Sequence, residues 1–527
     1  MGTTGDGASR AGSLLIRRAE LTAPFAAPFA APAPGSGGPR GIADVRIAGG
    51  RIVTISAAPL RAARGQPVLD ADGAALLPGL HDHHVHLLAL AAAASSVRAG
   101  PPQVTDAAGL RDALHTAAAS SLASAGAGAG AGWRWVRAVG YHPSVAGDLD
   151  RHRLDALLAD QPVRIQHRGG ALWVLNSLAL RLAGVADCPL PGVERDAAGH
   201  PTGRLWRLDD WLRRAAPIPR VGADLAALGR RAAAAGITGF TDATPGRADA
   251  ERQLLADAAR TGTLPQRLVL MRPEPGSSAP GSSEPSAAAG ERGPHTATPE
   301  DGAGGERGAD GPVKIILDDD RLPGLAALAE RFAAAHRGGH PVAVHCVTRT
   351  QTVLTLAALE LAGPAPGDRL EHAAVVPAEL HGALRRAGLT VVTQPNFIAE
   401  RGDRYRADVV EEDPATLYPA ASLLRAGIRL AAGTDAPFGD PDPWRAIRAA
   451  LDRRTAGGTV LGAPERLTAA AALALFLGEP GDPARPRVVR AGAPADLCLL
   501  DRPLAAALAD PSSSAVRHTI VAGTPLG

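Results

Sequence analysis

The stretch that decides the fold is LLPGLHDHHVHLL, residues 76–88, in which an apolar segment ends in a Pro-Gly pair and a histidine-rich segment follows. In an extended chain alternate side chains point to the same side, so His84 and His86 share one side, and His81 and His83 share the other. Two imidazoles on one side of a strand suit a single metal ion. We therefore predict that His84 and His86 bind a metal, and that His81 and His83 lie behind them or at the surface.

Short apolar segments alternate with Ala- and Leu-rich segments through much of the remaining chain. Examples are GITGFTDA (236–243), PVAVHCV (341–347) and IRLAAGTDAP (428–437), each followed by a helical pattern or a turn. Alternation at roughly 30-residue intervals indicates βα units and a parallel sheet. A chain of 527 residues is long enough for eight such units. We predict an α/β fold with a TIM-like (β/α)8 barrel over residues 76–445.

Both ends of the chain have strand patterns. Residues 43–55 (ADVRIAGGRIVTI) indicate a hairpin around a Gly-Gly turn, and residues 494–501 and 518–526 indicate further short strands. Because neither end has enough strands to be stable alone, we predict that the two ends form one small β-sandwich. The predicted domains are residues 1–75 for the N-terminal part of the sandwich, 76–445 for the barrel, and 446–527 for C-terminal helices and the remaining sandwich strands.

The interval between His86 and Lys314 is too long for the barrel alone. It spans 228 residues, whereas three βα units need about 90 to 100. We assign the surplus to a subdomain of about residues 100–235, inserted between barrel strands 1 and 4, and expect it to cover the barrel mouth and to select the substrate. Residues 123–132 form an Ala/Gly tract that we predict to be flexible, and residues 273–312 have almost no large apolar side chain and are predicted to be disordered.

The composition excludes several classes of function. The chain has 55 Lys and Arg residues against 53 Asp and Glu, so its net charge of +2 gives no general attraction for nucleic acid or anionic membranes. We find no apolar run of membrane-spanning length and no secretion signal, and the three widely spaced cysteines indicate no disulfide framework. We expect a cytoplasmic protein that acts on a small molecule, without a nucleic-acid or membrane partner. A homo-oligomer is compatible with these properties.

Lysine is almost absent, since 54 of the 55 basic residues are arginine and Lys314 is the only lysine. Arginine stays protonated, whereas lysine can lose its proton and form a carbamate. Either one lysine has survived by chance in an arginine-rich chain, or its chemistry is needed. The spacing favours the second explanation, because Lys314, His345 and His372 are 31 and 27 residues apart, one βα unit each, and Asp435 follows 63 residues later. On strands 4, 5, 6 and 8 of a barrel, these residues would meet His86 of strand 1 at one end.

This ordered set resembles that of the amidohydrolase superfamily. The string PGLHDHHVH (78–86) is similar to the superfamily signature Pro-Gly-x-x-Asp-x-His-x-His, and a lysine, two histidines and an aspartate follow in the family order. The sequence is most similar to the amidohydrolase family 3 branch, which contains N-substituted formamide deformylase-like proteins. One departure is LDDDRLPG (317–324), where this branch often has a single Asp followed by Gly. The segments that carry the resemblance to this branch are WRWVRAVGYH (133–142), residues 149–180, PTGRLW (201–206), GITGFTDA (236–243) and RLEHA (369–373).

The resemblance implies a metal-dependent hydrolase that cleaves an amide-type, non-peptide C–N bond, such as that of an N-substituted formamide, an N-acyl compound or a cyclic amide. A metal-bound hydroxide would attack the carbonyl, and Asp435 would transfer the proton to the leaving nitrogen. We expect one or two divalent metals per chain, with zinc favoured by the imidazole and carboxylate ligands. The implied ligands are His84, His86 and Asp435 for one metal, His345 and His372 for the second, and a carbamylated Lys314 as the bridge.

Two other functions remain open at this point. A deaminase on the same scaffold would use one metal and needs no bridging lysine, so the single lysine favours amide hydrolysis. A catalytically silent relative would be expected to lose ligands, whereas all of them are present. If Lys314 has only a structural role, its amine would pair with Asp318 or Asp319.

Six residues are predicted to contact the substrate. For two of them a structural explanation is also open: Trp173 lies in an apolar, helix-like run and fits a core, and Asn176 fits the cap of a following helix. The six are His142, His167, Trp173, Asn176, Arg204 and Asn396.

Overall fold

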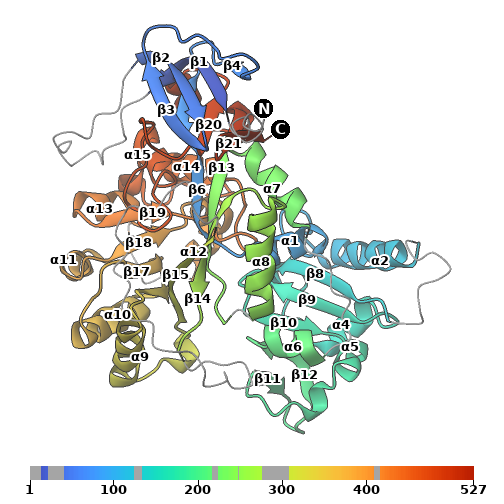
Figure 1. The fold of residues 1–527 in the computed structure, drawn as a ribbon. Coiled ribbons are helices and arrows are strands. Elements are labelled where there is room, and N and C mark those ends of the chain that lie inside the picture. The colour runs from blue at the N-terminus through green and yellow to red at the C-terminus, as the bar shows by residue number, and fades with distance from the viewer. Residues whose placement is uncertain are drawn as a thin grey trace, which may run out of the picture. The chain divides into compact units, whose positions relative to one another are not determined.

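A computed structural model describes residues 13–21, 41–123, 133–215, 224–246, 249–275, 308–408 and 416–526 (Figure 1). The chain divides into two compact units: unit 1 contains residues 1–87 and 225–527, and unit 2 contains residues 88–224. Nearly all of the Ala/Gly tract 123–132 and most of the segment 273–312 lie outside the described residues. No helix among the described residues is long and apolar enough to cross a membrane.

Unit 1 is built on an eight-stranded parallel sheet, which confirms the predicted TIM-like barrel. Lys314, His345 and His372 lie on its fourth, fifth and sixth strands, as the spacing predicted. The strands, in spatial order, are β6 (Leu80–Val85), β13 (Ile237–Asp242), β14 (Arg267–Arg272), β15 (Gly308–Ile316), β16 (Val342–Cys346), β17 (Arg369–His372), β18 (Thr390–Thr393) and β19 (Arg429–Ala432).

Helices follow the barrel strands along the chain. Several of them bury one apolar face; α9, for example, buries Leu328 and Phe332. The helices are α7 (Leu225–Ala234), α8 (Asp249–Thr261), α9 (Leu325–Arg337), α10 (Arg349–Ala362), α11 (His381–Arg386), α12 (Asn396–Asp408), α13 (Ala420–Arg425), α14 (Pro443–Asp452), α15 (Ala469–Ala474) and α16 (Leu504–Ala509).

The residues that follow β19 bind to β6, the first strand of the sheet. The Asp435 N–H donates to the His84 carbonyl at 2.8 Å, and the His86 N–H donates to the Ala436 carbonyl at 2.9 Å. Glycine is needed for this approach, because a Cβ atom at Gly433 would lie 2.4 Å from the His84 nitrogen. The last strand and the first therefore bring Asp435 beside the two predicted histidine ligands.

Two boundaries differ from the predictions. Residues 308–312 were expected to be disordered but form the start of β15, where Gly308 pairs with Leu268 of β14. The segment has little apolar surface, and main-chain pairing together with ion pairs from Arg252 and Arg272 to Asp310 stabilises it instead. In addition, the first barrel strand begins at Leu80, whereas the barrel was predicted to begin at residue 76.

The two ends of the chain form one mixed sheet in unit 1. Strand β20 pairs antiparallel with β5, and β5 pairs with β1, so blue and red strands lie side by side in Figure 1. The hairpin predicted at the Gly-Gly turn is present as β2 and β3. The sheet buries apolar residues from both ends, including Ile16, Val45 and Leu497. Its strands are β1 (Leu14–Leu21), β2 (Gly41–Ala48), β3 (Arg51–Ser56), β4 (Val68–Asp70), β5 (Ala75–Pro78), β20 (Leu497–Leu500), β21 (Val516–Val521) and β22 (Thr524–Leu526).

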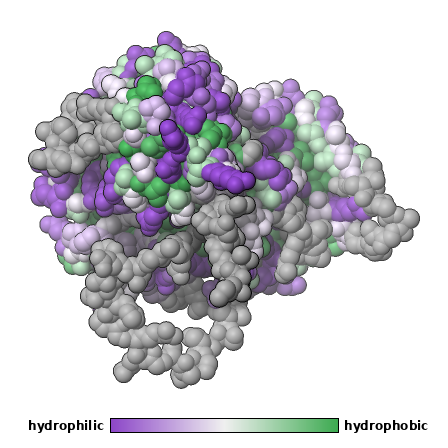
Figure 2. Space-filling model, turned by 45° about the horizontal axis from the view of Figure 1, so that its top comes forward, coloured by the Kyte–Doolittle hydropathy of each residue, from purple (hydrophilic) through white to green (hydrophobic). Residues whose placement is uncertain are grey.

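This terminal sheet is one sheet in the described residues, and its arrangement as a sandwich stays a prediction. Figure 2 is turned so that the top of Figure 1 comes forward. The surface seen in this view has hydrophilic and hydrophobic residues intermixed. Three large apolar side chains of the sheet, Ile42, Val53 and Val68, are exposed.

Unit 2 lies in the sequence between the first and second barrel strands. It contains a six-stranded sheet in the order β11-β12-β10-β9-β8-β7, with apolar clusters that include Ile165 and Leu205. Its strands are β7 (Val97–Arg98), β8 (Val136–Tyr141), β9 (Val163–His167), β10 (Leu172–Leu175), β11 (Val193–Arg195) and β12 (Pro201–Trp206). Its helices are α2 (Ala107–Ala123), α3 (Pro143–Ala146), α4 (Arg151–Leu157), α5 (Ser177–Leu182) and α6 (Asp209–Ala215), and α1 (Leu87–Ala94) begins at the unit boundary.

Candidate metal centre

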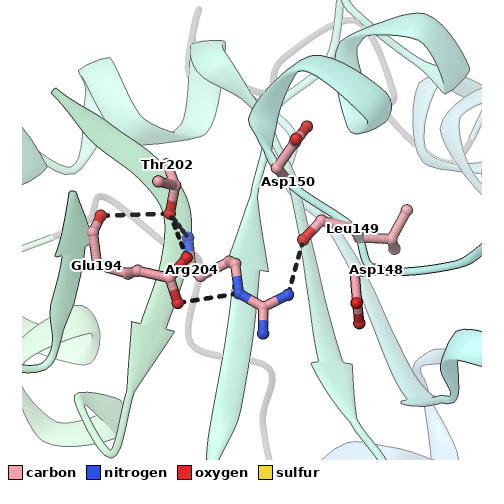
Figure 3. Close-up of a pocket in the computed structure, with 6 residues that line it drawn as sticks. All are labelled: Asp148, Leu149, Asp150, Glu194, Thr202 and Arg204. Carbon is pink, nitrogen blue, oxygen red and sulfur yellow. Dashed lines mark hydrogen bonds and ion pairs between the residues drawn. The ribbon is translucent and has the colours of Figure 1, made fainter. Parts of the chain in front are cut away.

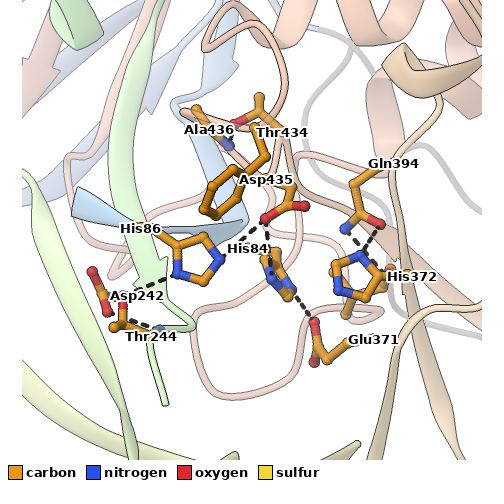
Figure 4. A network of polar contacts seen from close by, with 12 residues as sticks. His84, His86, Asp242, Thr244, Glu371, His372, Gln394, Thr434, Asp435 and Ala436 are labelled. Carbon is orange, nitrogen blue, oxygen red and sulfur yellow. Dashed lines mark hydrogen bonds and ion pairs between the residues drawn. The ribbon is translucent and has the colours of Figure 1, made fainter. Parts of the chain in front are cut away.

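Three predicted ligands meet at the end of the first barrel strand. The ligand atoms of His84, His86 and Asp435 all lie within 4.8 Å of one another (Figure 4). Asp435 Oδ1 is 3.1 Å from His86 Nε2 and 3.6 Å from His84 Nε2. Two imidazole nitrogens and one carboxylate oxygen at this spacing form the kind of three-ligand set that catalytic zinc uses, with positions left for water and substrate.

Hydrogen bonds to the other ring nitrogen fix the orientation of each histidine. His84 Nδ1 donates to the Glu371 carboxylate, and His86 Nδ1 lies 3.0 Å from the Thr244 hydroxyl. Figure 4 shows both contacts on the far side of the rings from Asp435. When Nδ1 is held in this way, Nε2 is left to face a metal, and the carboxylate partner makes the imidazole a stronger ligand.

Asp82 connects the first strand to the loop after the last one. Its Oδ1 accepts from the His84 N–H at 3.1 Å and from the Thr434 N–H at 3.0 Å, and its Oδ2 accepts from the Thr434 hydroxyl at 2.5 Å. Burial raises the pKa of Asp82 to about 6. The residue next to Thr434, Asp435, has φ of +55°, a strained conformation for a non-glycine residue. Asp82 thus holds the backbone that places this ligand.

His345 and His372, the predicted ligands of a second metal, are the next pair of histidines in the centre. The His372 ring is 4.7 Å from the His84 ring and 4.5 Å from the His345 ring, measured between centroids. His372 Nδ1 donates to Gln394 Oε1 at 2.8 Å, so its Nε2 is available as a ligand. Burial and the nearby His84 lower the pKa of His372 to about 3, which keeps the ring neutral. A neutral imidazole is the form that binds metal.

Lys314 is buried, with 2% of its surface exposed, and Nζ has no hydrogen-bond partner among the described residues. Burial lowers its pKa, although the charges of Glu371 and Asp435 oppose the shift. The alternative pairing of this amine with Asp318 or Asp319 is wrong, because no ion pair joins them. An amine without a partner inside a barrel is an expensive arrangement, which a covalent change or a ligand would relieve.

His81 and His83 lie on the other side of β6 and are fully buried, so the surface alternative of their predicted placement is wrong and the alternative behind His84 and His86 agrees with their burial. Their rings are 4.5 Å apart. His81 Nε2 lies 2.9 Å from the Thr241 hydroxyl, whereas neither ring nitrogen of His83 has a partner among the described residues. Burial lowers the pKa of both rings.

Glu371 is the most important residue that the sequence analysis missed. It is fully buried, it accepts from His84 Nδ1, and Arg369 Nε donates to its Oε1 at 2.7 Å. Burial alone would raise its pKa, but Arg369 and His84 bring the pKa well below the ordinary value, so the carboxylate is ionised. The available signal was an Arg and a Glu two residues apart, on one face of a buried strand.

The structure gives two of the predicted substrate residues other contacts. Asn176 is fully buried: its Oδ1 accepts from the N–H groups of Ala179 and Val163, and its Nδ2 donates to two carbonyls. Asn176 therefore caps α5 and has no hydrogen-bonding group left for a ligand. Asn396, in unit 1, donates to Glu400 and to the Thr434 carbonyl at 3.0 Å, which supports the loop that carries Asp435.

Three other predicted substrate residues lie within unit 2. His142 and His167 have ring centroids 6.1 Å apart, and His142 Nδ1 accepts from the Ser144 N–H as the cap of α3. Arg204 lines a pocket of about 330 Å³, where its Nε donates to Glu194 at 3.1 Å (Figure 3). The residues around this pocket are Asp148, Leu149, Asp150, Glu194, Thr202 and Arg204.

Trp173, the last of the six, lies in strand β10 and not in a helix as its apolar run suggested. It is buried, as the core explanation predicted, and its Nε1 donates to Asp209 at 2.6 Å. A short apolar run has the same pattern in a buried strand and in a buried helix, which accounts for the error.

Known proteins with a similar sequence or fold include metal-dependent hydrolases. The model of the amidohydrolase family matches residues 67–526. The N-substituted formamide deformylase of Arthrobacter pascens is 26% identical over 514 residues, which cover 87% of this chain and 90% of that protein. An uncharacterized metal-dependent hydrolase from Pyrococcus horikoshii OT3 has a similar structure, with a TM-score of 0.64 at 17% identity over 98% of this chain and 100% of that one. Atrazine chlorohydrolase from Arthrobacter aurescens TC1, complexed with zinc, gives a TM-score of 0.54 at 16% identity, over 97% and 95% of the two chains.

Proposed function

This chain belongs to the amidohydrolase family, and from that premise we propose that it hydrolyses the amide-type C–N bond of an N-substituted formamide or of a related N-acyl or cyclic amide. The family match covers most of the chain and includes every residue of the candidate centre. The formamide substrate class is supported by the similarity to a formamide deformylase along 87% of this chain.

The observation that carries the proposal is the convergence of His84, His86 and Asp435, whose ligand atoms lie within 4.8 Å of one another. We propose zinc as the metal, because two imidazoles and a carboxylate match its preferred ligands. The unpartnered amine of Lys314 fits a carbamate, which would offer anionic oxygens to a second metal held by His345 and His372. When bound, a divalent metal lowers the pKa of water and polarises a carbonyl oxygen.

The residues of the chain then have separate tasks. Although burial opposes ionisation of Asp435, contacts with His86 and His84 bring its pKa below the ordinary value, so it carries an anionic oxygen that can accept a proton from the attacking water. The same residue would return the proton to the leaving nitrogen. Glu371 keeps His84 in the orientation that the centre needs, and Asp82 holds the backbone on which Asp435 sits.

The test combines metal analysis with a substrate panel. We expect purified protein to contain one or two divalent metals per chain, and to hydrolyse N-formyl amines, N-acyl amines or cyclic amides with loss of activity after chelation and recovery after zinc is added. Aminopyrimidines and aminotriazines should be included, because a deaminase would release ammonia from them. A protein that contains metal but releases ammonia only from aromatic amines would refute amide hydrolysis.

A further inference from the structure

Unit 2 contains two arginines that lie side by side near a single tryptophan. Arg137 of β8 and Arg164 of β9 are direct partners in the parallel pairing of these strands, so their side chains leave the sheet on the same face. Their guanidinium carbons lie 5.4 and 5.0 Å from the centroid of the Trp173 ring. Both distances are within the range of a cation–π contact.

Among the described residues, neither guanidinium has a carboxylate bound to it. Arg164 is only 8% exposed, its Nε has no hydrogen-bond partner, and no ion pair involves it among the described residues. The hydrogen bond of Arg137 goes to the neutral Ser96 hydroxyl. A carboxylate close enough to attract both arginines is that of Asp209, whose Oδ1 accepts from Trp173 Nε1 at 2.6 Å. The described part of unit 2 therefore holds two neighbouring arginines, one of them nine-tenths buried, with no anion bound to either guanidinium, although the charge of Asp209 attracts both.

Such an arrangement is costly for the free protein. Taking a guanidinium out of water without hydrogen bonds is unfavourable, and a second like charge on the next strand adds repulsion. The lowered pKa values agree with this: burial lowers the pKa of Arg164 to about 9 and that of Arg137 to about 10. Stacking on an indole offsets only part of this cost, since a cation–π contact is weaker than the hydrogen bonds that a guanidinium loses on burial.

We propose that Arg137 and Arg164, with Trp173 as a flat support, form a binding site for the carboxylate of a small organic acid. The planar fork of a guanidinium matches the two oxygens of a carboxylate, and one anion between two guanidinium groups would supply the missing hydrogen bonds. Because both guanidinium groups lie over the Trp173 ring, an anion such as benzoate bound to them would change the surroundings of the indole. This site goes beyond the proposed hydrolase activity and does not depend on it.

The experiment uses the full-length protein as purified, with sodium benzoate and sodium acetate as probes and sodium phosphate as the alternative anion at matched ionic strength. We expect benzoate to change tryptophan fluorescence with saturation and to raise the melting temperature. Arg164→Gln should weaken benzoate binding at least tenfold. Arg181→Gln is the matched control, because Arg181 is exposed on α5 of the same unit. The affinity of this variant for benzoate should stay within twofold of that of the wild type.

A second variant separates binding from a purely structural role. Arg164→Met keeps a long side chain and removes the buried charge, so we expect a higher melting temperature without anion and no further increase when benzoate is added. The proposal is overturned if the wild-type protein binds neither benzoate nor acetate with saturation. It is likewise overturned if Arg164→Gln binds benzoate with the affinity of the wild type, because that result would place the bound carboxylate elsewhere, for example at the metal centre. It is also overturned if phosphate alone binds, or if Arg164→Met lowers the melting temperature.

Discussion

Replacing Glu371 with Gln tests how much metal binding at the candidate centre depends on a carboxylate that is not among the predicted ligands. Glu371 and Arg369 form an ion pair whose side chains are 0% and 3% exposed, and the same carboxylate accepts from His84 Nδ1. Arg369 also donates to the His83 carbonyl at 2.9 Å, and this neutral contact remains in Glu371→Gln. Breaking a buried ion pair costs about 3 to 5 kcal/mol, and we expect a value near 3 kcal/mol because Gln keeps one acceptor oxygen.

The loss of the carboxylate should also weaken metal binding. Removing a partner of a ligating histidine typically lowers metal affinity by about 10- to 100-fold, which corresponds to about 1.4 to 2.7 kcal/mol. We would measure affinity by competition with a chromogenic chelator and stability by urea unfolding of the metal-free protein. Both quantities should fall in the same variant, since one carboxylate serves both contacts.

The matched control is Glu379→Gln. Glu379 pairs with Arg349 at 2.7 Å, but the two side chains are 56% and 53% exposed, so this change should alter stability by less than about 1 kcal/mol and leave metal affinity unchanged. Metal affinity within twofold of the wild type in Glu371→Gln would show that the buried carboxylate does not orient His84. Equal destabilisation by the two variants would show that burial of the Arg369 pair has no energetic consequence.

Three further predictions concern the centre and the thiols. His84→Ala and Asp435→Asn should each abolish turnover while circular dichroism shows an unchanged fold, because both side chains lie at strand ends that face the site. Measurable turnover in either variant would remove that residue from the mechanism. Lys314→Arg should lose activity and at least one metal per chain despite keeping the positive charge, and Lys314→Ala should regain activity with added formate or propionate; normal metal content and activity in the Arg variant would end the carbamate proposal. Burial raises the pKa of Cys346 and Cys498 to about 12 each, so neither thiol should react with Ellman's reagent at pH 8 until the protein is unfolded, and rapid reaction of native protein would contradict their burial.

Much of the barrel was predictable because its signals are local. Several strands are short apolar runs, and the intervals between Lys314, His345 and His372 repeat the length of one βα unit. Those positions alone assign the residues to β15, β16 and β17, and a barrel of parallel strands brings their ends to one face. The ligand group of His84, His86 and Asp435 follows from the same rule.

What the sequence did not reveal depends on contacts between distant residues. Glu371 meets His84 across 287 positions of the chain, and nothing near Glu371 indicates which ring it holds. Residues 308–312 have no apolar pattern, and their strand exists because β14 offers a partner. The arginine pair of unit 2 is visible only once β8 and β9 are in register. In each case tertiary pairing supplies information that composition and periodicity lack.

The pairing of β5 with β20 has a consequence for synthesis of the protein. β5 leaves the ribosome long before one of its two neighbours, β20, which is encoded more than 400 residues later. Until that segment is released, β5 has one edge without main-chain partners, and such edges favour association with other chains. Completion of the terminal sheet is therefore expected to be a late, slow step, because long-range strand pairing requires closure of a large loop. Chains that stop before Leu497 would present this open edge permanently, and ribosome-bound chains would need protection of it until β20 has been made.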